Sequence, residues 1–229
     1  MPKLLFDMYG VLMRPATPES HADLERLLAP PDTEAMWEAY GFYRPDYDAG
    51  IFSDSHYWNE VAARAGLGEV PVAEAVACEN RGLLEADQEM VALVKGLIGE
   101  GYSVGILSNI PTTLAGQVRK KYTWLEDCAA VTFSCDIGVA KPHPEAYRVA
   151  VDALAAQPKD THFFDDRIDY VEGASYCGLN AHLFRGIDSV REVLSTLEGA
   201  AQLQRLAQEL IGGHGAGYRA DNLLMAGNH

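Results

Sequence analysis

The chain has 229 residues, of which 48% are hydrophobic and 22% are charged. These values exclude a disordered chain and are typical of a soluble globular protein with room for one sizeable domain and an insertion. The formal net charge of −15 repels nucleic-acid backbones and anionic membranes, so neither is expected as a partner. No membrane span or signal peptide is evident, which predicts a cytoplasmic protein.

The four cysteines are scattered and contain no C-x-x-C pair, which argues against a zinc site or a disulfide framework. We interpret them as free thiols in a reducing compartment. They are Cys78, Cys128, Cys135 and Cys177.

Five short apolar runs predict the strands of a parallel sheet. They are Lys3–Phe6, Tyr102–Leu107, Ala130–Phe133, Thr161–Phe164 and Ala181–Leu183. Because several are apolar nearly throughout rather than alternating, both faces of the sheet are expected to be covered. Helical patterns separate the strands, and this alternation predicts a doubly wound α/β fold.

Residues 15–85 contain helical patterns but no convincing strand, so they predict a helical cap domain inserted after the first strand. The expected helices are Ala22–Leu28, Glu34–Tyr40, Ser55–Ala65 and Val72–Leu83. The core domain is then expected at residues 1–14 and 86–198, with a C-terminal helix and flexible tail at 199–229. In the cap, eight aromatic residues are expected to form a small core. Arg14 and Arg44, near the cap hinge, could contact an anion, although we favour solvated charge for each. The aromatic residues are Trp37, Tyr40, Phe42, Tyr43, Tyr47, Phe52, Tyr57 and Trp58.

Polar residues follow several of the predicted strands at the point where each strand ends. Asp7 follows the first strand, Ser108-Asn109 the second and Asp165-Asp166 the fourth, while Lys141 lies in the expected loop Asp136–Lys141. In a parallel doubly wound sheet these ends share one edge, where ligands usually bind. Carboxylates gathered there repel one another unless a hard cation such as Mg²⁺ lies between them. One of the carboxylates could then act as a nucleophile.

These residues resemble four motifs of the haloacid dehalogenase superfamily. The run Phe6–Leu12 is similar to the first motif, an apolar strand that ends in D-x-D-G-T/V-L, and Leu107–Asn109 is similar to the second. Lys141-Pro142 resembles the third motif and Phe163–Asp166 the fourth. Their order and spacing agree across about residues 1–190. The resemblance implies a subfamily I member with a Rossmann-like core, a helical C1 cap and a phosphatase-like, Mg²⁺-dependent activity on a small-molecule substrate.

The resemblance also implies roles for individual residues. Asp7 would be the nucleophile and a metal ligand, with the backbone carbonyl of Tyr9 and the carboxylate of Asp166 as further ligands. Asp165 would hold Lys141 or a metal-bound water. The implied catalytic and substrate-binding residues are Asp7, Met8, Tyr9, Gly10, Ser108, Asn109 and Lys141. For Asn109, orienting Asp7 and capping a helix remain open, and a homodimer is also compatible with the sequence.

One position departs from the superfamily pattern. Tyr9 stands where the family has its general acid/base aspartate, and a phenol with a pKa of about 10 is a poor base near neutrality. Tyrosine here resembles the superfamily's 2-haloacid dehalogenases, in which halide leaves without a proton. Those enzymes lack metal, however, and the Asp165-Asp166 pair would repel the carboxylate of a haloacid. We therefore favour phosphatase-like hydrolysis, with dehalogenation and a non-catalytic binding protein as alternatives.

Overall fold

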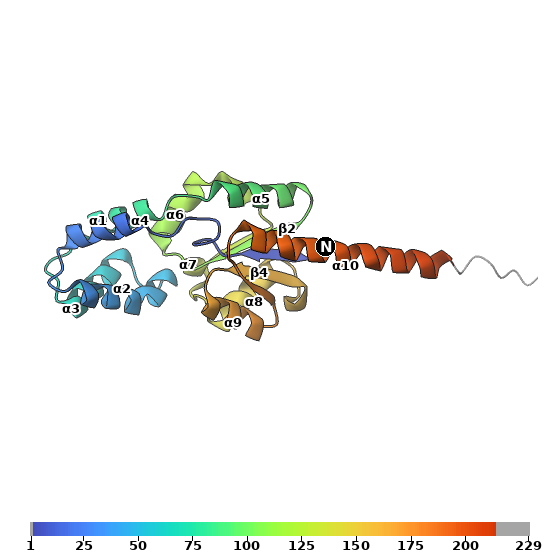
Figure 1. The fold of residues 1–229 in the computed structure, drawn as a ribbon. Coiled ribbons are helices and arrows are strands. Elements are labelled where there is room, and N and C mark those ends of the chain that lie inside the picture. Colours follow the sequence, from blue (N-terminus) through green and yellow to red (C-terminus); the bar gives the residue numbers. More distant parts are fainter. Residues whose placement is uncertain (1, 214–229) are drawn as a thin grey trace, which may run out of the picture. The chain divides into compact units, whose positions relative to one another are not determined.

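The centre of the molecule is a five-stranded sheet in the order β3-β2-β1-β4-β5, with every neighbouring pair of strands parallel (Figure 1). The structure is a computed structural model that describes residues 2–213. Its strands are β1 (Lys3–Phe6), β2 (Ser103–Ser108), β3 (Ala130–Phe133), β4 (Thr161–Asp165) and β5 (Asn180–Leu183). The predicted α/β fold is confirmed, and each expected strand is present to within one residue at either end.

The register aligns the carboxyl ends of the three central strands. Phe6 of β1 lies opposite Ile106 of β2 and Phe164 of β4, and all three side chains are fully buried. The amide of Asp7 donates to the carbonyl of Phe164, which extends this pairing by one residue. The residues that follow these strands therefore emerge side by side at one edge of the sheet.

Helices cover both faces of the sheet, as the apolar strands predict. The core helices are α5 (Gln88–Gly99), α6 (Thr112–Lys121), α7 (Ser134–Ile137), α8 (Pro144–Ala153) and α9 (Ile168–Tyr176), with 3₁₀ turns at Thr123–Asp127 and Pro158–Asp160. Helices α8 and α9 bury their apolar faces against Leu5, Leu107 and Phe163, while α5 and α6 lie on the opposite side (Figure 1). Helix α7 takes up the beginning of the expected loop Asp136–Lys141.

Four helices, and no strand among the described residues, form the segment between β1 and α5. They are α1 (Pro18–Leu28), α2 (Thr33–Asp48), α3 (Asp54–Ala65) and α4 (Val72–Gly82). Side chains of Thr17, Asp32 and Ser53 accept hydrogen bonds from backbone amides at the starts of α1, α2 and α3, which explains where these helices begin. We call these four helices the cap.

The cap has its own apolar core, built largely from aromatic rings. The rings of Tyr47 and Tyr57 stack with their centroids 4.1 Å apart, and Trp58 is fully buried beside them. Seven of the eight aromatic residues expected in this core belong to it or pack against it. Phe42 is the exception, because it is 60% exposed on the outer surface of α2.

The cap meets the core domain through hydrogen bonds near the end of α2. The hydroxyl of Ser134 accepts from the amide of Ile110 at 2.9 Å and donates to the carbonyl of Asp48. Asp54 also links the cap helices to the sheet-containing part, because one carboxylate oxygen accepts from Thr113 at 2.7 Å and the other from Tyr47 of the cap at 2.8 Å. These contacts hold the carboxyl end of α2 against the core.

The described chain divides into a compact unit that ends at Ile187 and a second that begins at Asp188. The described part of the second unit belongs to helix α10 (Ile187–Gly213), which includes the helix expected after residue 199. The flexible tail expected beyond it lies outside the described residues. Across residues 2–213, no helix combines the length and the apolar character needed to cross a membrane.

Candidate active site

Three carboxylates from two adjacent strand ends converge at the carboxyl edge of the sheet. Asp7 follows β1, Asp165 ends β4 and Asp166 comes next in the chain. Each offers an oxygen, and these three oxygens all lie within 4.8 Å of one another. Asp7 and Asp165 are buried, whereas Asp166 is more exposed. The sequence prediction that these side chains meet at one place agrees with this geometry.

Lys141 lies between two of these carboxylates. Its ammonium nitrogen is 2.6 Å from Oδ1 of Asp7 and 2.6 Å from Oδ2 of Asp165, and its side chain is fully buried. The same nitrogen lies 4.9 Å from the ring centroid of Tyr170, close enough for a cation–π interaction. These contacts hold a charged lysine in the interior and orient Asp7 from one side.

The donor set suits a hard divalent cation. Three carboxylates against the single ammonium of Lys141 leave a formal excess of two negative charges. Burial raises the pKa of Asp7 above its ordinary range, and Lys141 opposes that rise. Burial likewise raises the pKa of Asp166, and the neighbouring charge of Asp165 adds to it. Oxygen ligands carrying uncompensated charge are what Mg²⁺ prefers in proteins.

A tight turn carries the chain away from Asp7. Gly10 has a φ of +85°, and a Cβ atom at this position would lie 2.3 Å from Oδ2 of Asp166. Glycine is therefore required both by the backbone conformation and by the close approach of Asp166. The amide of Gly10 donates to the carbonyl of Met13 at 2.8 Å, so this amide is already engaged within the turn. The carbonyl of Met8 accepts from the amide of Leu12 at 2.8 Å and closes the turn.

The side chain of Asn109 forms hydrogen bonds with the backbone of Lys141. Its side-chain amide donates to the carbonyl of Lys141 at 2.9 Å, and its Oδ1 accepts from the amide of Lys141 at 2.8 Å. The same amide donates to the hydroxyl of Tyr170 at 3.2 Å. Neither role left open by the sequence, orienting Asp7 or capping a helix, describes these contacts. Ser108 is fully buried beside Asn109 at the end of β2.

Residues 4–178 match the family model of haloacid dehalogenase-like hydrolases. The chain belongs to this family. It is 26% identical to Phosphatase MT3486 of Mycobacterium tuberculosis over 79% of this chain and 85% of that protein.

Solved structures of other members of the family share its fold. A Bacteroides thetaiotaomicron family enzyme in complex with magnesium and inorganic phosphate is 21% identical, with a TM-score of 0.67 over 81% of this chain and 94% of that one. L-2-haloacid dehalogenase from Xanthobacter autotrophicus, with chloropropionic acid covalently bound, is 19% identical, with a TM-score of 0.60 over 85% of this chain and 83% of that one.

The distinctive residue of this hydrolase, Tyr9, points its hydroxyl into a buried environment. The hydroxyl oxygen is inaccessible and has no hydrogen-bond partner among the described residues. Burial raises the pKa of Tyr9 well above its ordinary value, with Arg44 of the cap opposing the rise and Asp48 and Asp7 adding to it. Tyr9 therefore remains a neutral phenol at physiological pH.

One residue of the hydrolase's site escaped the sequence analysis, and one cap residue departs from the expectation that was favoured for it. Tyr170, in α9, contacts both Lys141 and Asn109, and only its position four residues after Asp166 could have drawn attention to it. Arg44 was expected to be solvated, and this prediction is wrong, because its side chain is 20% exposed and paired with Asp48 and Glu79. Arg14, by contrast, is exposed and pairs with Glu85 on the surface.

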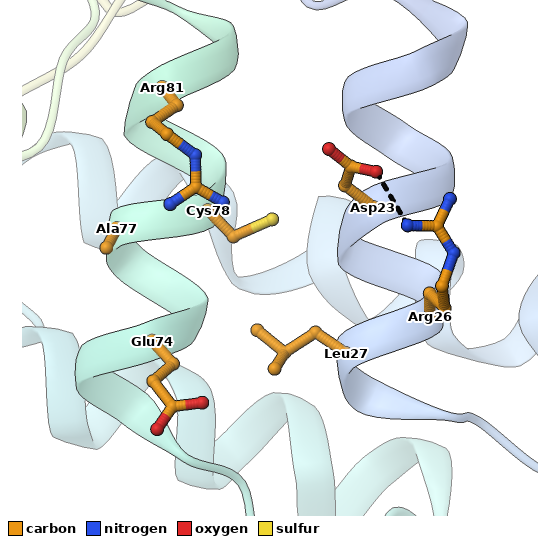
Figure 2. A pocket seen from close by; sticks show the side chains of 7 residues that line it. All are labelled: Asp23, Arg26, Leu27, Glu74, Ala77, Cys78 and Arg81. Carbon is orange, nitrogen blue, oxygen red and sulfur yellow. Dashed lines mark hydrogen bonds and ion pairs between the residues drawn. The ribbon is translucent and has the colours of Figure 1, made fainter.

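A separate pocket of about 490 Å³ lies between α1 and α4 of the cap (Figure 2). Figure 2 shows Arg81 and Glu74 on one helix facing the ion pair of Asp23 and Arg26 on the other. None of its seven lining residues belongs to the carboxylate cluster. We therefore assign the active site to the edge of the sheet and not to this groove.

Proposed function

We propose that this hydrolase is a magnesium-dependent phosphatase that acts on a small phosphorylated metabolite. The observation that carries the proposal is the buried ammonium of Lys141, 2.6 Å from both Asp7 and Asp165, within a group of three carboxylates. This arrangement orients Asp7 as a nucleophile, and a metal ion would balance the negative charge that Lys141 does not. The relatives support the proposal, because one is named a phosphatase and another binds magnesium and phosphate.

The residues would hold magnesium through the carboxylates of Asp7 and Asp166 and the backbone carbonyl of Tyr9. When bound, the ion supplies electrostatic stabilisation of the phosphoryl oxygens. Lys141 would contribute a second positive charge to those oxygens, and Asp165 would keep Lys141 in place. The buried hydroxyl of Ser108 and the backbone around Met8, Gly10 and Asn109 would line the phosphoryl site.

In the first step, an oxygen of Asp7 attacks phosphorus as the bond from phosphorus to the leaving-group oxygen breaks. The leaving oxygen takes a proton from the Tyr9 phenol or from water. Water then attacks the phosphorus of the aspartyl phosphate, the bond to Asp7 breaks, and the proton of the water passes to the Tyr9 oxygen or to solvent. Both proton transfers are slow in this scheme, because burial disfavours the phenolate that Tyr9 would form as an acid, and the neutral phenol cannot act as a base.

The test is a screen of phosphate esters and 2-haloacids, each with magnesium and with a chelator. Phosphate release that the chelator abolishes is the expected result. Halide release that resists the chelator would instead support dehalogenation, which Tyr9 favours. Magnesium binding without turnover of either class would indicate a non-catalytic protein.

Two substitutions sharpen this test. Asp7→Asn should abolish turnover while the protein stays folded by circular dichroism, and substantial residual activity would remove Asp7 from the nucleophile role. Tyr9→Asp should raise the turnover of phosphate esters by about 10²-fold or more if a missing general base limits the reaction. No gain, with magnesium binding intact, would contradict that explanation of slow turnover.

A further inference from the structure

The backbone of Lys141 is held by the side chain of Asn109, and Asn109 is in turn held by Tyr170. The amide of Lys141 can only donate, and it donates to Oδ1 of Asn109 at 2.8 Å. The side-chain nitrogen of Asn109 carries two N–H groups. It donates to the carbonyl of Lys141 at 2.9 Å and to the hydroxyl of Tyr170 at 3.2 Å. Tyr170 therefore completes the set of hydrogen bonds that orients the side chain binding Lys141.

The ring of Tyr170 makes a second contact with the same lysine, at the other end of its side chain. Nζ of Lys141 lies over this ring, 4.9 Å from its centroid, and 5.4 Å from the ring centroid of Phe163. Ion pairs with Asp7 and Asp165 take up two of the three N–H groups of the ammonium. Two aromatic rings and two carboxylates therefore confine the ammonium, and under the proposed function its third N–H would donate to a phosphoryl oxygen.

Tyr170 is itself held in place by neighbouring residues. Its backbone carbonyl accepts from the hydroxyl of Tyr147 at 2.8 Å, and Tyr147 is fully buried in α8. A Cβ atom at Gly173 would lie 2.9 Å from that hydroxyl, so the glycine leaves room for the contact. The guanidinium of Arg167 lies over the ring of Tyr170, 4.4 Å from its centroid. A side chain constrained in this way is able to position another one.

We propose that Tyr170 is a positioning residue for Lys141 and acts through two separable contacts. Its hydroxyl holds Asn109, which sets the backbone of Lys141, and its ring holds the ammonium beside Asp7. In this assignment Tyr170 acts through Lys141 and not on the substrate. Loss of either contact would let the ammonium shift relative to Asp7, and a misplacement of about 1 Å at a reacting centre can cost about 10²-fold in rate.

The ring contact is tested by NMR spectroscopy, which requires no turnover. The terminal methylene signal of Lys141, in protein labelled with carbon-13 lysine, is assigned by its loss in Lys141→Arg. A proton facing an aromatic ring is shifted upfield, so Tyr170→Leu should move this signal downfield, whereas Tyr170→Phe keeps the ring and should move it much less. Tyr176→Leu is the matched control and should leave the signal in place, because Tyr176 lies on the same helix and is 88% exposed.

The same variants separate the two contacts in catalysis, and this part of the inference rests on the proposed phosphatase activity. With magnesium and p-nitrophenyl phosphate, Tyr170→Phe should lower kcat/KM by about 3–10-fold, because it removes one hydrogen bond. Tyr170→Leu also removes the ring from the ammonium and should lower kcat/KM by about 30-fold or more. The loss should fall mainly in kcat, since Lys141 would act on charge that develops during the reaction. Tyr176→Phe and Tyr176→Leu should stay within about twofold of wild type.

A double-mutant cycle distinguishes positioning from a general loss of structure. If the hydroxyl acts through Asn109, Tyr170→Phe should cost less than about twofold in kcat/KM once Asn109→Ala is present. Two losses that multiply would mean that the hydroxyl does not act through Asn109, and they would overturn the proposal. Circular dichroism establishes that each variant is folded, and Asn109→Ser replaces Asn109→Ala if the latter is not.

Two further results overturn the inference while leaving the phosphatase proposal intact. They are a methylene signal of Lys141 that Tyr170→Leu does not move, and a wild-type kcat/KM in both variants at position 170. If the wild-type protein cleaves no phosphate ester, the proposed function is wrong, but the NMR comparison still decides whether the ring of Tyr170 positions Lys141.

Discussion

Removing the side chain of Lys141 should destabilise the protein strongly. At 2.6 Å and an effective dielectric constant of about 20, each of its ion pairs with Asp7 and Asp165 is attractive by about 6 kcal/mol. Desolvation of the buried charges offsets much of this attraction. What remains on removal is the cost of leaving two buried carboxylates close together without a counter-charge, and loss of one partner from a buried pair typically costs about 3–5 kcal/mol.

We therefore expect Lys141→Ala to lower the free energy of unfolding by about 3–5 kcal/mol in chelator-treated protein. Urea titrations followed by circular dichroism give this difference, provided that the slopes of the two transitions agree. Lys95→Ala is the control, because Lys95 is exposed on α5 and its replacement should change stability by less than about 0.5 kcal/mol. If the two variants lost similar amounts, the argument from buried ion pairs would be refuted.

Two further predictions concern a turn and a histidine pair. Gly10→Ala should destabilise the protein by about 1–2 kcal/mol and weaken magnesium binding by about 10–100-fold, because its φ is +85° and its Cβ would displace Asp166. Urea titration and calorimetry measure the two effects, and Gly96→Ala, at a helical site with nothing within 4 Å, should be stabilising instead. Burial lowers the pKa of His182 to about 4, and the adjacent His162, 3.0 Å away, adds to this. The unfolded chain, with a histidine pKa of about 6.5, then binds a proton that the folded state excludes, so stability is retained above pH 6.5 and falls between pH 6.5 and 4. After allowance for the half-buried ring, His182→Gln should remove about 1 kcal/mol of the loss seen between pH 7.5 and 5.5, and identical losses in wild type and variant would contradict this assignment.

The sheet edge could be predicted from the sequence because its signals are local. A strand buried on both faces must be apolar nearly throughout, so the polar residue that ends each run, such as Asp7 after Phe6, is visible as a break in the pattern. In a parallel sheet all such breaks fall on one edge. The convergence of Asp7 and Asp165 follows from this rule, whereas Lys141 comes from the segment after β3 and α7.

The supporting contacts could not be predicted, because they depend on side-chain directions and on pairings far apart in the sequence. Tyr170 of α9 contacts Asn109 and Lys141, which lie 61 and 29 positions earlier in the chain, and no local pattern joins these residues. The helix predicted from the sequence ended at Tyr40, so the prediction did not relate Arg44 to Asp48.

The observed α2 runs on to Asp48, which places Asp48 one helical turn beyond Arg44. Its other partner, Glu79, comes from a different helix, and nothing in the local pattern joins the two. The spacing of apolar residues predicts which face of a helix is buried, but it does not predict which polar residues are buried with that face.

The charge balance of the catalytic edge explains why the proposed chemistry would require a divalent ion. This edge has two more carboxylates than ammonium groups. Under the proposed function, a phosphate ester would therefore meet negative charge that Lys141 alone does not balance. A divalent ion would then be needed to bind the substrate as well as to promote the reaction.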